Sequence, residues 1–317
     1  MFSVIVVWHA AISALMAATG PSGLEFALLP TWAAVSVAEG RGVRAVWLLA
    51  IGVAAAWLAS RNGGMTAYVG LAAAAGAPIG IAIRRGWRYD HAVGAAGLFG
   101  IVGVLALVFV FWTDWLGGAA DVYAAVRSEM EAVADRNADM RYVALVDLTR
   151  GVLVDHWSDV GIGIAFWPVL LGCGVSAGAA SRVYAARSGK TGLTGGFAEF
   201  RAPDALAWGV IALTLAWYAD TRLPDLGLRP FAWNGAIAVT AVYWLTGMAV
   251  LAYGLRMTRA PFVVRGAVYV GVNMLFGMPM PAALGLSDTW VDFRGRLQRW
   301  ADARRADSES DGPDGPE

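Results

Sequence analysis

The sequence predicts an all-α fold, a polytopic transmembrane helical bundle with about eight spans plus a proline-broken C-terminal hairpin or ninth span. Of its 317 residues, 58% are hydrophobic and 15% are charged, whereas soluble domains average about 45–50% and about 25%. Fifteen tryptophans add side chains that favour the boundary between lipid and water. The apolar runs are long and continuous, unlike the short alternating segments of a membrane β-barrel.

Apolar runs locate the membrane helices, because a span needs roughly 17–25 residues. The first run begins at Phe2 with no basic segment before it, so we expect a retained helix rather than a cleaved signal peptide. The predicted helices cover 2–18, 24–39, 44–60, 65–83, 91–113, 160–181, 204–220 and 232–255. A last apolar region, 262–287, contains Pro279 and Pro281, which interrupt helical hydrogen bonding. It is either one kinked span or two half-length helices.

The distribution of basic residues predicts the orientation, because cytoplasmic loops carry an excess of Lys and Arg. With the C-terminal tail inside and 262–287 as a hairpin, the inside collects 17 basic residues and the outside seven. A single span would separate the five arginines of the tail from the other basic loops. We therefore favour the hairpin, with both termini cytoplasmic.

Composition divides the chain into four parts. An N-terminal transmembrane half (1–113) precedes a connector (114–159) with nine acidic residues and four arginines. Apolar residues recur at helical spacing in the connector, which predicts amphipathic helices. They either cap the bundle or form a lid or partner-docking element. A C-terminal transmembrane half (160–300) leads to a predicted disordered tail (301–317), which is rich in turn formers.

Several functional classes are disfavoured. A net charge of zero argues against nucleic-acid binding. Cys173 is the only cysteine, so no disulfide is expected. A metal site is possible only in principle, because the three histidines lie far apart in the sequence: His9, His91 and His156. We expect no cofactor.

No enzyme motif is found. Gly189-Lys190-Thr191 resembles the end of a phosphate-binding loop, but that loop needs Gly at 184, where the chain has Tyr184. The nucleophile and zinc-binding motifs of common hydrolases are absent. We therefore expect no enzymatic activity, and any energised transport would need a separate motor protein.

Small residues at helical spacing predict close contacts between membrane helices. Ala10, Ala14 and Ala18 form a stripe on the first helix. Pairs with the GxxxG pattern occur at Gly76/Gly80 and Gly174/Gly178. These residues either pack inside the bundle or, for the alanine stripe, dock on another membrane protein.

Polar side chains inside apolar runs are costly in a membrane and often functional. Arg265, Tyr269 and Asn273 are four apart and share one helical face. With Asn234, at the start of the eighth helix, they form a candidate solute-binding set. Alternatively, the Arg265 side chain extends to the lipid headgroups.

A second polar group follows the last apolar region. Asp288 and Asp292 are four apart and precede Arg294. The two aspartates cap a terminal helix, or pair with Arg294 at the membrane surface, or belong to a solute-binding cluster.

Several motifs occur in order along the chain: Phe166-Trp167-Pro168, the element Phe197-Ala198-Glu199-Phe200-Arg201-Ala202-Pro203, Asn234, Thr246-Gly247-Met248-Ala249-Val250, and the ending Leu284-Gly285-Leu286-Ser287-Asp288-Thr289-Trp290-Val291-Asp292-Phe293-Arg294. With these motifs the chain resembles the YybS family of predicted bacterial membrane proteins, a domain of unknown function. The resemblance covers nearly the whole chain, and its specific part is residues 197–296.

The resemblance implies a fold similar to the S-components of energy-coupling factor vitamin transporters. In those proteins an alanine stripe on the first helix docks on a transmembrane coupling partner, a pattern that Ala10, Ala14 and Ala18 match. The structural family motif would be Asp288, Trp290, Asp292 and Arg294.

The expected function is therefore that of a small-solute binding and transport protein of the bacterial cytoplasmic (inner) membrane. Its expected partners are the lipid bilayer and either a coupling protein or further copies of the chain. The alternative is a membrane scaffold or assembly factor that transports nothing.

Overall fold

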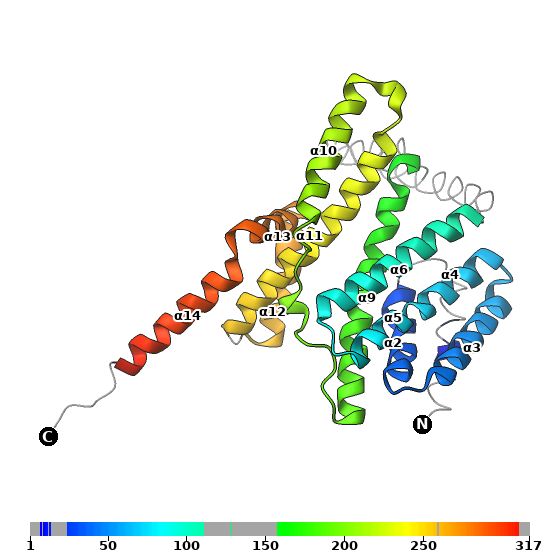
Figure 1. Cartoon of the computed structure of the whole chain (residues 1–317), viewed down its shortest axis with the longest axis horizontal. Coiled ribbons are helices and arrows are strands. Elements are labelled where there is room, and N and C mark those ends of the chain that lie inside the picture. The colour runs from blue at the N-terminus through cyan, green and yellow to red at the C-terminus, as the bar shows by residue number, and fades with distance from the viewer. Residues whose placement is uncertain are drawn as a thin grey trace. The chain divides into compact units, whose positions relative to one another are not determined.

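The computed structural model describes residues 7, 9–11, 13, 24–110, 128, 157–258 and 260–310 (Figure 1). Within these ranges all regular elements are helices, and the sole backbone bridge joins Arg88 to Thr194. This confirms the predicted all-helical class. Most of the first predicted helix and of the connector 114–159 falls outside the described residues.

The chain folds into two compact units, which we describe separately. Unit 1 comprises 1–194 and 209–239, and unit 2 comprises 195–208 and 240–317. Unit 1 contains α2 (Leu24–Ala38), α3 (Gly42–Ser60), α4 (Gly63–Ala74), α5 (Gly76–Arg84), α6 (Tyr89–Val110) and α9 (Trp157–Ser188). Two helices contribute residues to both units: α10 (Leu206–Arg222) and α11 (Arg229–Met257). Unit 2 contains α12 (Phe262–Phe276), α13 (Pro279–Val291) and α14 (Phe293–Ser310).

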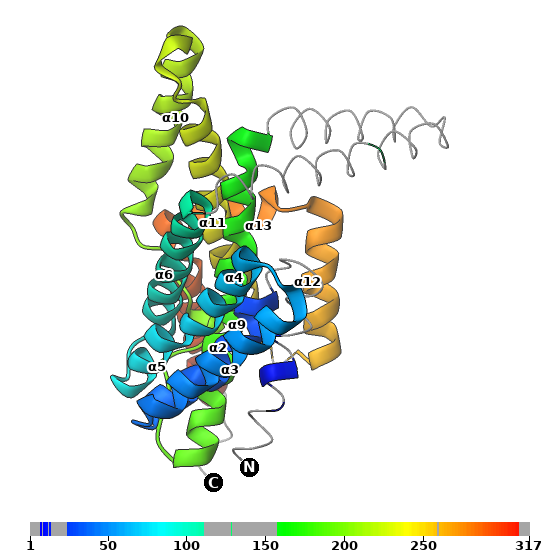
Figure 2. The same cartoon turned by 90° about the vertical axis from the view of Figure 1, so that its right-hand side faces the viewer.

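The central helix of unit 1 is α2, which packs against α3, α4, α5 and α9 (Figure 2). Phe26, Leu29 and Val35 are fully buried there. With 15 residues, α2 is shorter than a membrane span. The apolar run 24–39 therefore forms a helix that is largely buried by other helices. Hydropathy alone does not distinguish such a helix from one in contact with lipid.

Glycines allow α5 to approach the backbone of α2. A Cβ atom on Gly76 would lie 2.5 Å from the Pro30 carbonyl oxygen, and one on Gly80 would lie 2.5 Å from the Ala34 carbonyl oxygen. Both distances are shorter than any ordinary contact, so the helices could not approach this closely with larger residues. The Gly76/Gly80 pair thus packs inside the bundle.

The last apolar region is broken, as its prolines predict. Helices α12 and α13 are bent by 105° at the break between them. Gly277 lies in the break with a φ of +63°, a conformation that favours glycine. Pro279 is the first residue of α13, where its missing N–H has no helical partner to lose.

The C-terminal tail differs in part from its prediction. Helix α14 continues to Ser310, so residues 301–310 are helical rather than disordered, while 311–317 lie outside the described residues. The sequence Ala301-Asp302-Ala303-Arg304-Arg305-Ala306 contains alanines and arginines, which are strong helix formers. Low hydrophobicity alone therefore did not identify a disordered segment.

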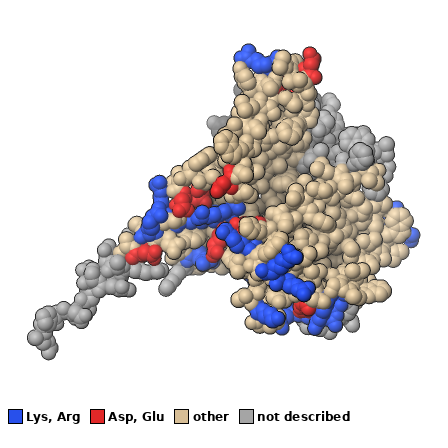
Figure 3. All heavy atoms as spheres, viewed as in Figure 1, with Lys and Arg blue, Asp and Glu red and all other residues tan. Residues whose placement is uncertain are grey.

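Five helices of the described chain are long and apolar enough to cross a membrane, or six if the bent α12–α13 pair counts as one span. These helices are Gly42–Ser60, Gly63–Arg84, Tyr89–Leu107, Phe166–Ser188 and Arg229–Met257. α10, with 17 residues, is not among them. Most of the face in Figure 3 is uncharged, and α3 exposes Trp47 and Leu58, as expected of surfaces in contact with lipid.

Candidate functional site

Asn234, from the predicted solute-binding set, lies in unit 1 and forms hydrogen bonds within the protein. Its Oδ1 accepts from the Gly163 backbone N–H at 2.7 Å, and its Nδ2 donates to the Pro230 carbonyl at 2.8 Å. The amide therefore links α11 to α9, and the second bond stays within α11.

The other three residues of this set lie on α12 in unit 2. Arg265 Nε donates to the Ala260 carbonyl at 2.8 Å. Asn273 Oδ1 accepts from Trp244 Nε1 at 3.0 Å, and Asn273 Nδ2 donates to the Tyr269 carbonyl at 2.8 Å. The bond from Trp244 joins α11 to α12, and the other two bonds are local to α12 and the residues just before it. The structure thus uses polar atoms of the predicted set for contacts within each unit.

Ala10, in the predicted docking stripe, is half-buried. Ala14 and Ala18 lie outside the described residues.

Two C-terminal motifs meet in unit 2, where they form a cluster that we call the C-terminal clamp: Phe200, Arg201, Asp288, Asp292 and Arg294. Arg294 Nη2 forms an ion pair with Asp288 Oδ2 at 3.3 Å and donates to the Phe200 carbonyl at 2.8 Å. Arg201 Nη2 forms an ion pair with Asp292 Oδ1 at 3.1 Å. The clamp fastens the end of α13 to the segment before α10.

The two ion pairs of the clamp differ in burial. The side chains of Asp288 and Arg294 are each 4% exposed, whereas those of Arg201 and Asp292 are 51% and 47% exposed. Burial lowers the pKa of Arg294, and the nearby Asp288 carboxylate opposes that shift. The guanidinium remains a cation at neutral pH, so loss of the Asp288 carboxylate would leave an uncompensated charge inside unit 2.

Asp292 also ends α13. It adopts a left-handed conformation with a φ of +47°, which Asp tolerates better than most residues do. Asp288 Oδ1 accepts from the Phe293 backbone N–H at 3.0 Å. Trp290, the fourth residue of the family motif, is exposed, which suits an aromatic side chain at the lipid boundary.

Backbone contact between α11 and α13 explains two glycines within the motifs. A Cβ atom on Gly247 would overlap the Pro281 carbonyl, and one on Gly285 would overlap the Tyr243 carbonyl. The two helices therefore cross with their backbones touching. Sequence reasoning did not assign this role, because no spacing rule relates residues on different helices.

A buried polar site lies in unit 1, where the first helix meets α3; we call it the His9–Ser13 site. The side chains of His9 and Ser13 are buried. His9 Nε2 and Ser13 Oγ each lie 2.9 Å from the position that a Cβ atom would take on Gly52. Neither atom has a hydrogen-bond partner in the described chain.

The His9 ring forms a hydrogen bond with the Leu48 backbone, and its unpartnered atom is Nε2. The donor to Leu48 is therefore Nδ1, and in a neutral imidazole Nε2 is then an acceptor. The Ser13 hydroxyl can donate or accept. Together they present two buried polar atoms that have no partner among the residues that the structure describes.

Glu25, in the first turn of α2, is also fully buried within unit 1. Glu25 was not among the residues predicted from the sequence, and His9 was considered only as a metal ligand. Both lie inside predicted spans, and His9 is four residues from Ser13, so polar residues at membrane depth were the available signal.

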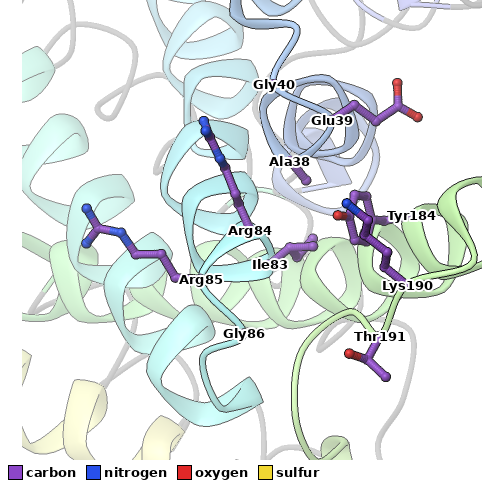
Figure 4. Close-up of a pocket in the computed structure, with 10 residues that line it drawn as sticks. All are labelled: Ala38, Glu39, Gly40, Ile83, Arg84, Arg85, Gly86, Tyr184, Lys190 and Thr191. Atoms are coloured by element: carbon purple, nitrogen blue, oxygen red, sulfur yellow. The ribbon is translucent and has the colours of Figure 1, made fainter.

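A pocket of about 760 Å³ opens at one end of unit 1 (Figure 4). Its lining comes from the C-terminal ends of α2, α5 and α9 and from the segments that follow them. Charged lining residues are Glu39, Arg84, Arg85 and Lys190. No group of three or more His, Cys, Asp or Glu suited to a metal ion occurs among the residues that the structure describes.

Residues 167–289 match a protein family described as "Predicted membrane protein (DUF2232)". No curated protein and no solved structure matches the chain. The matched segment contains Phe200, Asn234, Gly247 and Gly285, and it ends before Asp292. The family match and the apolar helices together show a membrane-embedded protein, and the match supports its placement in a family of membrane proteins of unknown function.

Proposed function

We propose that this protein binds a small solute among its membrane helices and passes it to the cytoplasm, without enzymatic activity and without an ATPase of its own. The observation that supports this proposal is the His9–Ser13 site. Two buried polar atoms from one helix converge on the space left by Gly52, and neither has a partner in the described chain.

Buried polar atoms are normally hydrogen-bonded, and each one that is not destabilises the fold by about 1–3 kcal/mol. A polar group of a solute that bonds to Nε2 and Oγ would remove that penalty. The site therefore favours a solute with a small polar group that can donate to the imidazole.

The proposal includes a separate partner. Ala10, the residue of the alanine stripe that the structure describes, directly follows His9 on the first helix. A coupling protein docked on this stripe would contact the helix that holds the solute, in an arrangement similar to that of S-components. The proposed location is the bacterial cytoplasmic membrane, with both termini inside.

The test compares small molecules that co-purify with the wild type, with Gly52→Ala and with Gly42→Ala. A Cβ atom at 52 enters the His9–Ser13 site, whereas one at 42, on the same helix, meets nothing within 4 Å. Mass spectrometry should identify a compound in the wild type and in Gly42→Ala that is missing from Gly52→Ala. The same compounds in all three proteins, with Gly52→Ala folded, would contradict the proposal.

The second candidate is a non-transporting scaffold or assembly factor. It is favoured by the C-terminal clamp, which joins two segments of unit 2. It is also favoured by the side-chain amides of Asn234 and Asn273, because the oxygen and nitrogen of each amide bind other parts of the protein. This alternative predicts no specific small molecule in the purified wild type, together with protein partners that co-purify.

A further inference from the structure

The pocket of unit 1 is formed where three helices end in the same way. Gly40 follows α2, Gly86 follows α5 and Gly189 follows α9, with φ values of +75°, +64° and +67°. A left-handed glycine is a common helix C-cap. The chain therefore turns away sharply at each helix end, which leaves a hollow between the ends.

Hydrogen bonds hold the wall that carries Lys190. The Lys190 backbone N–H donates to Ser188 Oγ at 3.2 Å. Further along, the Tyr89 N–H donates to the Thr194 carbonyl, and the Thr194 N–H donates to the Trp87 carbonyl, both at 3.0 Å. These bonds tie the segment after α9 to the segment between α5 and α6. Figure 4 shows Lys190 beside Tyr184, below Ala38.

The pocket has an excess of positive charge. Its one carboxylate, Glu39, already forms ion pairs with Arg41 at 2.9 Å and with Arg187 at 3.1 Å. Arg84, Arg85 and Lys190 have no carboxylate within ion-pair distance among the described residues. The lining thus has three cationic side chains and one acidic side chain, and that acidic side chain is paired with two arginines outside the lining.

Compensation of the helix dipoles does not account for this excess. A helix C-terminus carries roughly half a negative charge, so three ends offset fewer than two of the three lining cations. Glu39 is already paired with Arg41 and Arg187, which lie outside the lining. The remaining positive charge lines a hollow of about 760 Å³, a size within the roughly 300–1,000 Å³ of small-molecule sites.

We infer that this pocket binds a phosphate group, held by Arg84 and Lys190. Arginine and lysine are the side chains that bind phosphate through charge-assisted hydrogen bonds. Two sources share this chemistry: the headgroup of an anionic phospholipid and a free phosphorylated compound. Basic pockets at the ends of membrane helices are known sites for lipid headgroups. The pocket is separate from the His9–Ser13 site, so this inference goes beyond the proposed function.

The experiment titrates delipidated full-length protein in detergent with three probes: phosphatidylglycerol, phosphatidylcholine and inorganic phosphate at constant ionic strength. The test variant Arg84→Gln/Lys190→Gln removes two pocket charges. The control variant Arg182→Gln/Arg222→Gln removes two exposed charges of unit 1 that do not line the pocket. Lys190→Arg keeps the charge and should retain binding.

We expect saturable binding that the test variant weakens by about tenfold or more, because each lost cation removes a charge-assisted hydrogen bond. The control variant should bind as the wild type does. Preference for phosphatidylglycerol over the other probes would identify a headgroup, and binding of inorganic phosphate without a lipid preference would identify a free compound.

Equal weakening in both double variants would show that only the diffuse charge of the surface attracts the probes, and would overturn the inference. Absence of saturable binding by any probe would overturn it as well. Gly52→Ala should leave the binding of these probes unchanged. Failure of this inference can therefore be told apart from failure of the proposed function.

Discussion

At the scale of single residues, the C-terminal clamp shows how burial assigns different roles to two similar ion pairs. Asp288 with Arg294 is buried, and Asp292 with Arg201 is about half exposed. Removal of one partner of a buried pair leaves an uncompensated charge inside the protein, whereas an exposed charge is solvated by water. Asp288, rather than Asp292, is therefore the aspartate on which the fold of unit 2 depends.

We expect Asp288→Asn to lower the free energy of unfolding by about 3–5 kcal/mol, because it strands the buried Arg294 guanidinium. Asp292→Asn is the matched control and should change it by about 1 kcal/mol or less, since Asn also tolerates a left-handed conformation. Thermal unfolding in detergent measures both variants. A larger loss for Asp292→Asn would show that the exposed pair is the important one.

The sequence predicted part of this cluster. The spacing of Asp288, Asp292 and Arg294 suggested a helix cap or an ion pair as one of its alternatives, and in the structure Asp288 pairs with Arg294. It could not reveal Phe200 and Arg201, which lie about 90 residues away, because periodicity relates only residues on the same element. The segments 197–203 and 284–294 are both motifs of the family resemblance, but the resemblance does not indicate that they contact each other.

At the scale of helices, backbone contact determines where glycine is required. Gly247 and Gly285 lie where α11 and α13 touch. GxxxG spacing predicted a close helix contact at Gly76 and Gly80, which lie on one face, and the structure shows that their partner is α2. It did not predict the α11–α13 crossing, because there each helix contributes a single glycine.

Gly285→Ala should destabilise unit 2, because its Cβ atom would overlap the Tyr243 carbonyl and force the two helices apart. Overpacking of this kind lowers the free energy of unfolding by about 1–3 kcal/mol. Gly271→Ala, on α12, is the control, since a Cβ atom there meets nothing within 4 Å. Equal unfolding temperatures for the two variants would argue against backbone contact at this crossing.

Helix lengths could be predicted less well than helix positions. The runs at 24–39 and 65–83 both read as single spans, and Gly63–Arg84 is long enough to be one, although α4 and α5 are separate within it. The run at 24–39 instead forms the 15-residue α2. Hydropathy measures how favourably a side chain leaves water, and an apolar side chain leaves water by packing against protein as well as by contact with lipid. The break at Pro279 was predictable because proline acts on its own backbone.

At the scale of the whole molecule, the charge distribution predicts that both termini are cytoplasmic and that the connector lies outside. A protein with Cys173 replaced, and with single cysteines at Ser128 or Ser308, should react with an impermeant thiol reagent on whole cells only at position 128. Ser128 is exposed, so its lack of reaction would not result from burial. Reaction at 308 instead would reverse the topology.

The central claim is that the His9–Ser13 site is kept polar for a ligand rather than for stability. Ser13→Ala decides between the two, because the hydroxyl has no partner in the described chain. If the site serves a ligand, Ser13→Ala protein that has been stripped of small molecules should be more stable than the stripped wild type by about 1–3 kcal/mol. Its unfolding temperature should then be higher by about 2 °C or more. An unfolding temperature below that of the wild type would show that the hydroxyl stabilises the fold, and would contradict the claim.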